Sequence, residues 1–177
     1  GSTRGHLLVT GAEGLAAEFE EHRARLRGVA FRLLGSMHDA DDAVQETWIR
    51  FGRADRSSIE NVGGWLTTVV SRVSLTMLRD DRRRAALRIP DPVVGPDADD
   101  GPEERSVVAD AVSGALLVVL DTLPPTQRVA FVLHDLFGWP FDDIAPIAGT
   151  TPGAARQLAS RARRRVRVRR RRFATAA

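Results

Sequence analysis

The segment from residue 138 to residue 172 limits the fold more than any other part of the chain. It predicts a short helix, a turn at Gly149 and a second helix, with Thr151 as the capping residue and Pro152 at the first helical position. Pro146 lies inside the first of these helices, and we expect it to kink or shorten that helix because proline removes a backbone hydrogen bond. The segment therefore predicts a helical hairpin whose second helix starts at a well-defined residue.

The second helix of this hairpin has an apolar face and a basic face. Its apolar residues recur at helical spacing, and they are Ala155, Leu158, Ala159 and Ala162. The outward positions carry side chains that contact bases and phosphates in the major groove of DNA, and they are Thr151, Arg156, Gln157, Ser160, Arg161, Arg163 and Arg164. An ordinary hairpin with a solvated basic face is the alternative. We predict a DNA-binding helix-turn-helix.

Charge is distributed unevenly along the chain. All 26 basic residues are arginine, and the residues after 149 include ten of them and no acidic residue. Subtracting this +10 from the formal net charge of +3 leaves −7 for residues 1–149. Such a basic segment binds phosphates with release of counterions, so its affinity should fall steeply as salt rises. For residues 169–172 we favour contacts with phosphates that do not depend on sequence.

Composition excludes several classes of protein. A chain of 177 residues with 43% hydrophobic content can bury cores of its own. It has no cysteine, which excludes disulfides and thiol nucleophiles, and no apolar run of the length needed for a membrane span or a signal peptide. A cytoplasmic location fits best. We find no catalytic motif, so we expect no enzymatic activity, no metal site and no cofactor.

Helical periodicity accounts for nearly all of the predicted structure, and β-type alternation is scarce. Three helices are expected in the first domain, and they cover residues 13–34, 39–53 and about 61–81, before an arginine run at 82–84. The first helix should stop at Gly35, and Ser36 offers a capping group for the second. This domain is expected to span residues 12–87. Residues 1–11 have no periodicity and are expected to be a tag or disordered.

A linker separates this domain from a second helical domain. Residues 88–104 contain four prolines and six acidic residues against one arginine, a composition that cannot fold alone. The second domain is expected at 105–168, with helices at 107–123 and 125–137 ahead of the hairpin, and residues 169–177 form a basic tail. The predicted fold class is all-α, with two small helical domains joined by an acidic, proline-rich linker.

In three stretches the chain resembles the bacterial sigma factors of the extracytoplasmic-function type. They are HDADDAVQETWIRF at 38–51, GWLTTVVSRVSLTMLRDDRRR at 64–84 and the terminal hairpin, in this order and spacing. The resemblance covers about residues 13–168. It implies that the first domain is sigma region 2 and the second is sigma region 4. The stretch at 115–145 is similar to a subgroup whose members often carry a SnoaL-like α+β domain after the hairpin, a domain that we expect to be absent here.

The resemblance implies that the helix at 39–53 docks on core RNA polymerase. The partner subunits implied are β and β′. The residues implied are Asp39, Asp42, Gln45 and Glu46. An acidic face of this kind suits a basic partner helix, whereas without the resemblance a solvated acidic face would be the simpler interpretation. A metal site built from these carboxylates and Asp41 is disfavoured, because Asp41 and Asp42 are adjacent and point apart.

The resemblance also implies two contacts with promoter DNA. The third helix would bind the opened minus-ten element through Asn61, Trp65, Thr68, Arg72, Thr76, Arg79 and Arg83. For Trp65 we favour packing in the core over stacking on a base, because its spacing to Val69 and Val73 continues the apolar face. The outward residues of the hairpin would bind the minus-thirty-five element. Some members of this group are also sequestered by an anti-sigma factor.

Two other classes of function remain as alternatives. The first is a stand-alone helix-turn-helix regulator that binds DNA as a dimer, although we see no heptad pattern for a dimer helix. The second is an enzyme with a DNA-binding appendage, which would need an active site that the first domain does not display. The sigma factor is the favoured interpretation.

Overall fold

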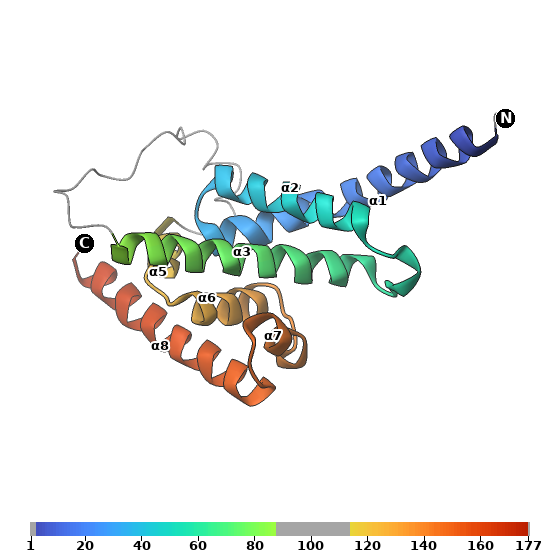
Figure 1. The fold of residues 1–177 in the computed structure, drawn as a ribbon. Helices are drawn as coiled ribbons and strands as arrows, with labels where there is room; N and C mark the ends of the chain where they lie inside the picture. Colours follow the sequence, from blue (N-terminus) through green and yellow to red (C-terminus); the bar gives the residue numbers. More distant parts are fainter. Residues whose placement is uncertain (1–2, 88–113, 177) are drawn as a thin grey trace.

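A computed structural model describes residues 3–87 and 114–176, and all regular structure within these two ranges is helical (Figure 1). The first range contains α1 (Thr3–Leu34), α2 (Met37–Arg53), a 3-10 turn (Arg56–Ser58) and α3 (Val62–Leu87). The second range contains α5 (Gly114–Leu120), α6 (Pro125–Phe131), a π-helical turn (Val132–Leu136), α7 (Phe141–Ala148) and α8 (Pro152–Thr175). The predicted all-α fold is confirmed. None of the described helices combines the length and the apolar character that crossing a membrane requires.

Two adjacent residues set the turn between α1 and α2. Gly35 has a φ of 74°, a left-handed conformation that glycine adopts without steric cost, and its N–H donates to the carbonyl of Phe31 at 2.7 Å. The hydroxyl of Ser36 accepts a hydrogen bond from the backbone N–H of Asp39 at 3.2 Å and so caps α2. The stop at Gly35 and the capping role of Ser36, both predicted, are confirmed.

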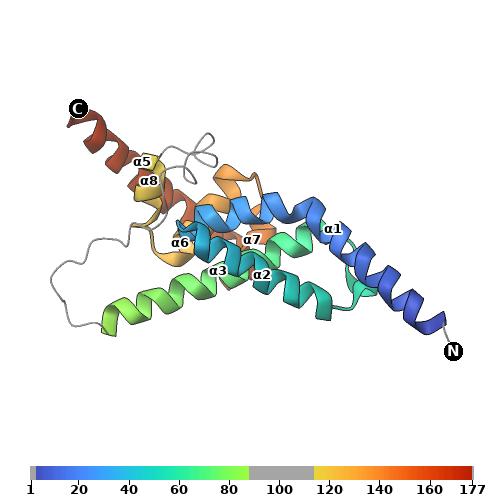
Figure 2. The same cartoon turned by 90° about the horizontal axis from the view of Figure 1, so that it is seen from above.

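Helix boundaries differ from the expected ones at the two ends of the chain. α1 begins at Thr3, although residues 1–11 were expected to lie outside the fold. α8 continues to Thr175 and thereby includes most of the expected basic tail. The first turns of α1 and the last turns of α8 project from opposite sides of the molecule (Figure 2). Adding turns to a helix that has already formed costs little, so these extensions need no packing signal in the sequence.

The expected linker at 88–104 lies outside the described residues. Of the helix expected at 107–123, the described part is α5, which ends at Leu120. The helix expected at 125–137 is present as α6 followed by the π-helical turn. The number and order of the predicted helices in the described ranges are therefore correct, whereas individual ends shift, most of all the start of α1 and the end of α8.

Aromatic side chains form the centre of the first domain. Phe19 of α1 and Phe51 of α2 are fully buried, with ring centroids 6.1 Å apart. Trp48 packs edge-on against Phe19 at 5.1 Å, and Trp65 of α3 lies 5.9 Å from Phe51. Fully burying one such side chain stabilises a fold by about 1.5–3 kcal/mol. The cluster thus joins all three helices of this domain.

The second domain packs directly against the first. In Figure 1, α3 lies between the α1–α2 pair and the helices α6, α7 and α8. α3 contacts α6 and α7, and α1 contacts α5 and the π-helical turn. One continuous apolar cluster includes Leu66 and Val70 of α3 together with Val129 and Leu133 of the second domain. The sequence predicts two domains joined by a linker, and in the described residues these two domains pack against each other.

Arg128 of α6 is a buried charged residue that connects the two domains. Only 3% of its surface is exposed. Its Nη2 lies 2.9 Å from Oδ1 of Asp121, and its Nε and Nη2 both donate to the backbone carbonyl of Arg32, each at 3.4 Å. Burial lowers the pKa of Arg128, and the charge of Asp121 partly offsets that effect. The guanidinium thereby provides a partner for a carbonyl in the last turn of α1, where helical partners are missing.

Candidate nucleic-acid interface

The α7–α8 hairpin is built from local signals at its turn. Gly149 ends α7 with a φ of 67°, and its N–H donates to the carbonyl of Ala145. The hydroxyl of Thr151 accepts a hydrogen bond from the N–H of Ala154 at 3.2 Å, and Pro152 is the first residue of α8. The predicted start of the second helix is therefore confirmed. Pro146 lies inside α7 without ending it, because the helix continues to Ala148.

α8 presents the predicted basic face to solvent. Ala155, Ala159 and Ala162 are fully buried against the rest of the domain, while Leu158 is half-buried. Of the predicted contact residues, five are exposed and two are half-buried: Thr151, Arg156, Gln157, Arg161 and Arg164 are exposed, and Ser160 and Arg163 are half-buried. Arginine and glutamine side chains, which can each form two hydrogen bonds with the edge of one base, therefore lie on the outer side of α8.

Two of these arginines have partners within the domain. The guanidinium of Arg156 lies over the ring of Phe141, 5.5 Å from its centroid. Arg163 forms a bidentate pair with Asp135, with Nε–Oδ2 and Nη2–Oδ1 distances of 2.6 and 2.9 Å. The hydrogen bonds that Arg163 donates to Asp135 raise the pKa of Arg163, against an opposing effect of burial. Arg156 is thus oriented at the start of α8, and Arg163 is engaged by a carboxylate that local periodicity does not reveal.

The predicted minus-ten residues follow one side of α3. Asn61 caps this helix, because its Oδ1 accepts from the N–H of Gly64 at 3.1 Å. The exposed members of the stripe are Asn61, Arg72, Thr76, Arg79 and Arg83, and the half-buried ones are Trp65 and Thr68. Val69 and Val73, on the other side, are buried as predicted. The structure therefore places these side chains along one line.

The second domain faces both ends of this stripe. At one end, a cleft of about 330 Å³ brings Trp65 and Thr68 opposite Asp142 and Asp143 in the first turn of α7. At the other end, a second cleft is lined by Arg79, Arg82, Arg83 and Ala86 of α3 and by residues 124–126. Sequence patterns did not reveal these neighbours. In the docked arrangement, acidic side chains of α7 thus stand opposite the residues predicted to hold an opened strand.

The acidic face of α2 is partly engaged in ion pairs. Asp42 and Gln45 are exposed, and His38 Nε2 lies 3.6 Å from Oδ2 of Asp42. Glu46, which is half-buried, pairs with Arg50 at 2.9 Å. Asp39 is also half-buried, and its backbone N–H belongs to the cap of α2. The four predicted residues therefore lie on one helix, with Asp42 and Gln45 the most accessible to a partner.

Asp41 points away from this face toward α1. Arg27 donates to both of its carboxylate oxygens, at 2.7 and 3.3 Å. Among residues 3–87 and 114–176, no group of three or more His, Cys, Asp or Glu side chains is arranged to hold a metal ion.

Two family models match the chain. The model described as Sigma-70 region 2 matches residues 19–84, and the model described as Sigma-70, region 4 matches residues 113–166. The first match covers α2, α3 and the packed part of α1, and the second covers the hairpin. The two matches, on two successive helical domains, define a protein of the sigma-70 class.

Curated relatives narrow this class. The chain is 48% identical over 155 residues to the ECF RNA polymerase sigma factor SigJ of Mycobacterium tuberculosis, with 85% of this chain and 49% of the relative covered. It is 30% identical over 146 residues to the RNA polymerase sigma factor CarQ of Myxococcus xanthus, with 81% of each covered. The chain belongs to the extracytoplasmic-function family of RNA polymerase sigma factors. It spans about half the length of SigJ.

Solved structures agree with this assignment. The crystal structure of Mycobacterium tuberculosis SigJ superposes with a TM-score of 0.61 at 44% sequence identity, covering 85% of this chain and 52% of that chain. The sigma factor RpoE of Bartonella quintana, solved in complex with the anti-sigma factor NepR, superposes with a TM-score of 0.62 at 22% identity, covering 90% and 98%. At that identity the second likeness shows the fold alone.

Proposed function

We propose that this chain is a sigma factor that binds core RNA polymerase and directs initiation at promoters with minus-thirty-five and minus-ten elements. The observation that carries the proposal is the outer side of α8, where Arg156, Gln157 and Arg161 are exposed opposite buried alanines. This side lies within the residues matched by the region 4 model. Arginine and glutamine distinguish guanine and adenine through paired hydrogen bonds in the major groove.

Polymerase binding is assigned to the acidic face of α2. Asp42 and Gln45 are its exposed members, and a partner helix with a basic surface would complement them. Charge complementarity of this kind speeds association and selects the partner. The pairs of Asp42 with His38 and of Glu46 with Arg50 are on the surface, so exchanging them for pairs with a partner costs little.

Binding of the minus-ten element is assigned to the stripe on α3. Trp65 and Thr68 line a cleft whose opposite wall carries Asp142 and Asp143 of α7, so the phosphates of an opened strand would be repelled there until the two domains shift apart. Arg72 and Thr76, farther along α3, are exposed. We infer that docking on polymerase separates the two domains and makes the whole stripe available.

Run-off transcription with core polymerase on a library of genomic fragments tests the proposal. We expect the intact chain to support transcription and Asp42→Arg to abolish it. The matched charge reversal Glu21→Arg, at an exposed position of α1, should leave transcription unchanged. Arg156→Lys keeps the charge but loses the planar fork, so it should change promoter preference more than total output. Transcription that is indifferent to Asp42→Arg and Arg156→Lys would overturn the assignment.

A gel shift separates this function from a stand-alone regulator. A sigma factor should bind promoter duplex weakly alone and strongly with core polymerase. A regulator should bind equally well without polymerase, and that outcome would replace the proposal. Since bacterial transcription takes place in the cytoplasm, we also propose a cytoplasmic location for this chain. We assign the chain no catalytic step of its own.

An anti-sigma factor is a further proposed partner, because the Bartonella quintana neighbour is solved with one. Such a protein would compete with polymerase for the acidic face of α2. A pull-down from the native cell should recover polymerase and, separately, a small inhibitor. Recovery of polymerase alone under both inducing and resting conditions would count against this partner.

A further inference from the structure

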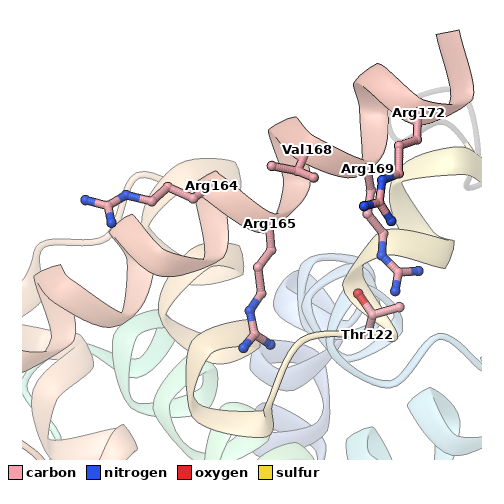
Figure 3. Close-up of a pocket in the computed structure, with 6 residues that line it drawn as sticks. All are labelled: Thr122, Arg164, Arg165, Val168, Arg169 and Arg172. Atoms are coloured by element: carbon pink, nitrogen blue, oxygen red, sulfur yellow. The ribbon is translucent and has the colours of Figure 1, made fainter. Parts of the chain in front are cut away.

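A further cleft, on the C-terminal domain, is lined by only one of the predicted recognition residues, Arg164 (Figure 3). It has a volume of about 340 Å³ and lies between the C-terminal half of α8 and the loop that follows α5. Its walls are formed by Thr122, Arg164, Arg165, Val168, Arg169 and Arg172. All four arginines are exposed.

Three of these arginines lie on the same side of the cleft. Figure 3 shows Arg165, Arg169 and Arg172 on the same side of α8, toward the loop that carries Thr122, whereas Arg164 extends to the other side. Their spacing of four and then three residues puts them on one helical face. Because a helix turns once in about 3.6 residues, this face lies roughly a third of a turn away from the recognition residues.

None of these three charges has an ion-pair partner among residues 3–87 and 114–176. Within the described ranges, no carboxylate lies within ion-pair distance of Arg165, Arg169 or Arg172, in contrast to Arg163 with its partner Asp135. The hydroxyl of Thr122 already donates to the carbonyl of Val119 at 2.7 Å. Like charges three and four residues apart repel one another, and a bound anion would remove that repulsion. In the part of the chain that the structure describes, the positive charge of the cleft is therefore uncompensated.

Phosphate is the anion that fits this arrangement best. The planar guanidinium matches phosphate oxygens with two parallel hydrogen bonds. At about 1.5 Å per residue, the three arginines extend over roughly 10 Å, which is the span of about two or three successive phosphates of one strand. An acidic protein segment would need an apolar anchor, and among the described residues of the lining Val168 alone is apolar.

We propose that this cleft is a second phosphate-binding site, which holds the backbone of a nucleic-acid strand without reading its sequence. α8 would then contact nucleic acid with two faces, one that specifies bases and one that adds affinity. The proposal rests on the proposed function in so far as the chain binds nucleic acid. It assigns a task to the helical extension of α8, which the recognition residues do not need.

Two double variants of the full chain test the site. Arg165→Gln with Arg169→Gln removes two charges from the cleft. Arg53→Gln with Arg167→Gln removes two exposed charges outside the lining, one at the end of α2 and one on α8, and is the control of equal charge change. Affinity for a random-sequence duplex, for a single strand of equal length and for inorganic tripolyphosphate is measured from low to moderate salt. Thermal unfolding checks that both variants fold.

The cleft variant should lose about tenfold or more in affinity for duplex or single strand and should reduce the slope of log Kd against log salt by about 2, the value for two lost phosphate contacts. The control should change both far less. Equal losses in the two variants would overturn the site in favour of diffuse attraction. Tight, cleft-dependent binding of tripolyphosphate without loss on either nucleic acid would overturn the assignment to a strand.

Run-off transcription keeps the two proposals distinguishable. If the intact chain supports transcription and the cleft variant binds nucleic acid as tightly as the control variant does, the second site alone is overturned. A chain that shows cleft-dependent binding but supports no transcription with core polymerase would overturn the sigma-factor proposal alone.

Discussion

Arg128 donates two hydrogen bonds across the domain boundary to the backbone carbonyl of Arg32, each at 3.4 Å. The same guanidinium pairs with Asp121 in the loop after α5, and a Cβ added at Gly35 would lie 3.0 Å from that carboxylate. The end of α1, the loop after α5 and the start of α6 thus meet at one buried cation. This point fixes how the second domain sits on the first.

Replacing Arg128 with methionine should therefore destabilise the docked protein. The variant leaves the carbonyl of Arg32 without its partner, at a net cost of about 1–3 kcal/mol, while Asp121 stays partly hydrated because its side chain is 58% exposed. Urea unfolding measures the free energy of unfolding of the variant and of the parent chain. Small-angle scattering measures whether the radius of gyration of the variant is larger than that of the parent. Asp121→Asn, which removes only the exposed partner, should cost less. Equal stability of Arg128→Met and the parent chain would contradict the role assigned to this residue.

Gly149→Ala should destabilise the second domain by about 1 kcal/mol, because the residue has a φ of 67°. A Cβ at this position meets no atom within 4 Å, so the cost is backbone strain and not a steric clash. Gly153→Ala is the matched control, since its Cβ also meets open space but it lies within α8. The control should leave the thermal midpoint unchanged or slightly higher. A loss at Gly153 as large as at Gly149 would show that the turn geometry is not the cause.

Features that depend on neighbouring residues could be predicted from the sequence. Gly149, Thr151 and Pro152 are adjacent signals, and together they placed the start of α8 correctly. Helical periodicity also separated the exposed and buried sides of α8 and α3. Most of the side chains predicted to face outward on these helices are exposed, because exposure follows from spacing. Their roles toward polymerase and DNA stay predictions.

Features that depend on distant residues could not be predicted. An apolar position on α3 has the same pattern whether its own domain or the other one buries it, so the docking of the two domains left no signal. Asp135 and Arg163 are 28 residues apart, and nothing local links them. Arg128 stands alone in the apolar stretch PTQRVAFVL, a pattern that indicates burial but does not identify Arg32 as its partner.

The pair of Arg163 and Asp135 should contribute a measurable coupling energy. Its side chains are 33% and 20% exposed, and its geometry is bidentate, so we expect about 1 kcal/mol, at the upper end for pairs near the surface. A double-mutant cycle with Arg163→Gln and Asp135→Asn in urea unfolding isolates this energy. The coupling should shrink as ionic strength rises, because partly exposed charges are screened. A coupling that is zero at low salt would show that the pair does not tie α8 to the π-helical turn.

Asp55 should titrate below its ordinary value of 3.8, because its carboxylate accepts hydrogen bonds from the hydroxyl and the backbone N–H of Ser57, at 2.7 and 3.0 Å. A carboxyl whose pKa is lower in the folded state adds stability above pH 3.8 and loses it as the pH falls through the folded-state pKa. The carboxyl carbon shift of Asp55, followed by NMR, measures this pKa directly. Ser57→Ala removes the stronger of the two hydrogen bonds and should move the midpoint back toward 3.8, while Ser58→Ala, which leaves that carboxylate untouched, should not. An unchanged midpoint in Ser57→Ala would show that the hydroxyl does not lower the pKa.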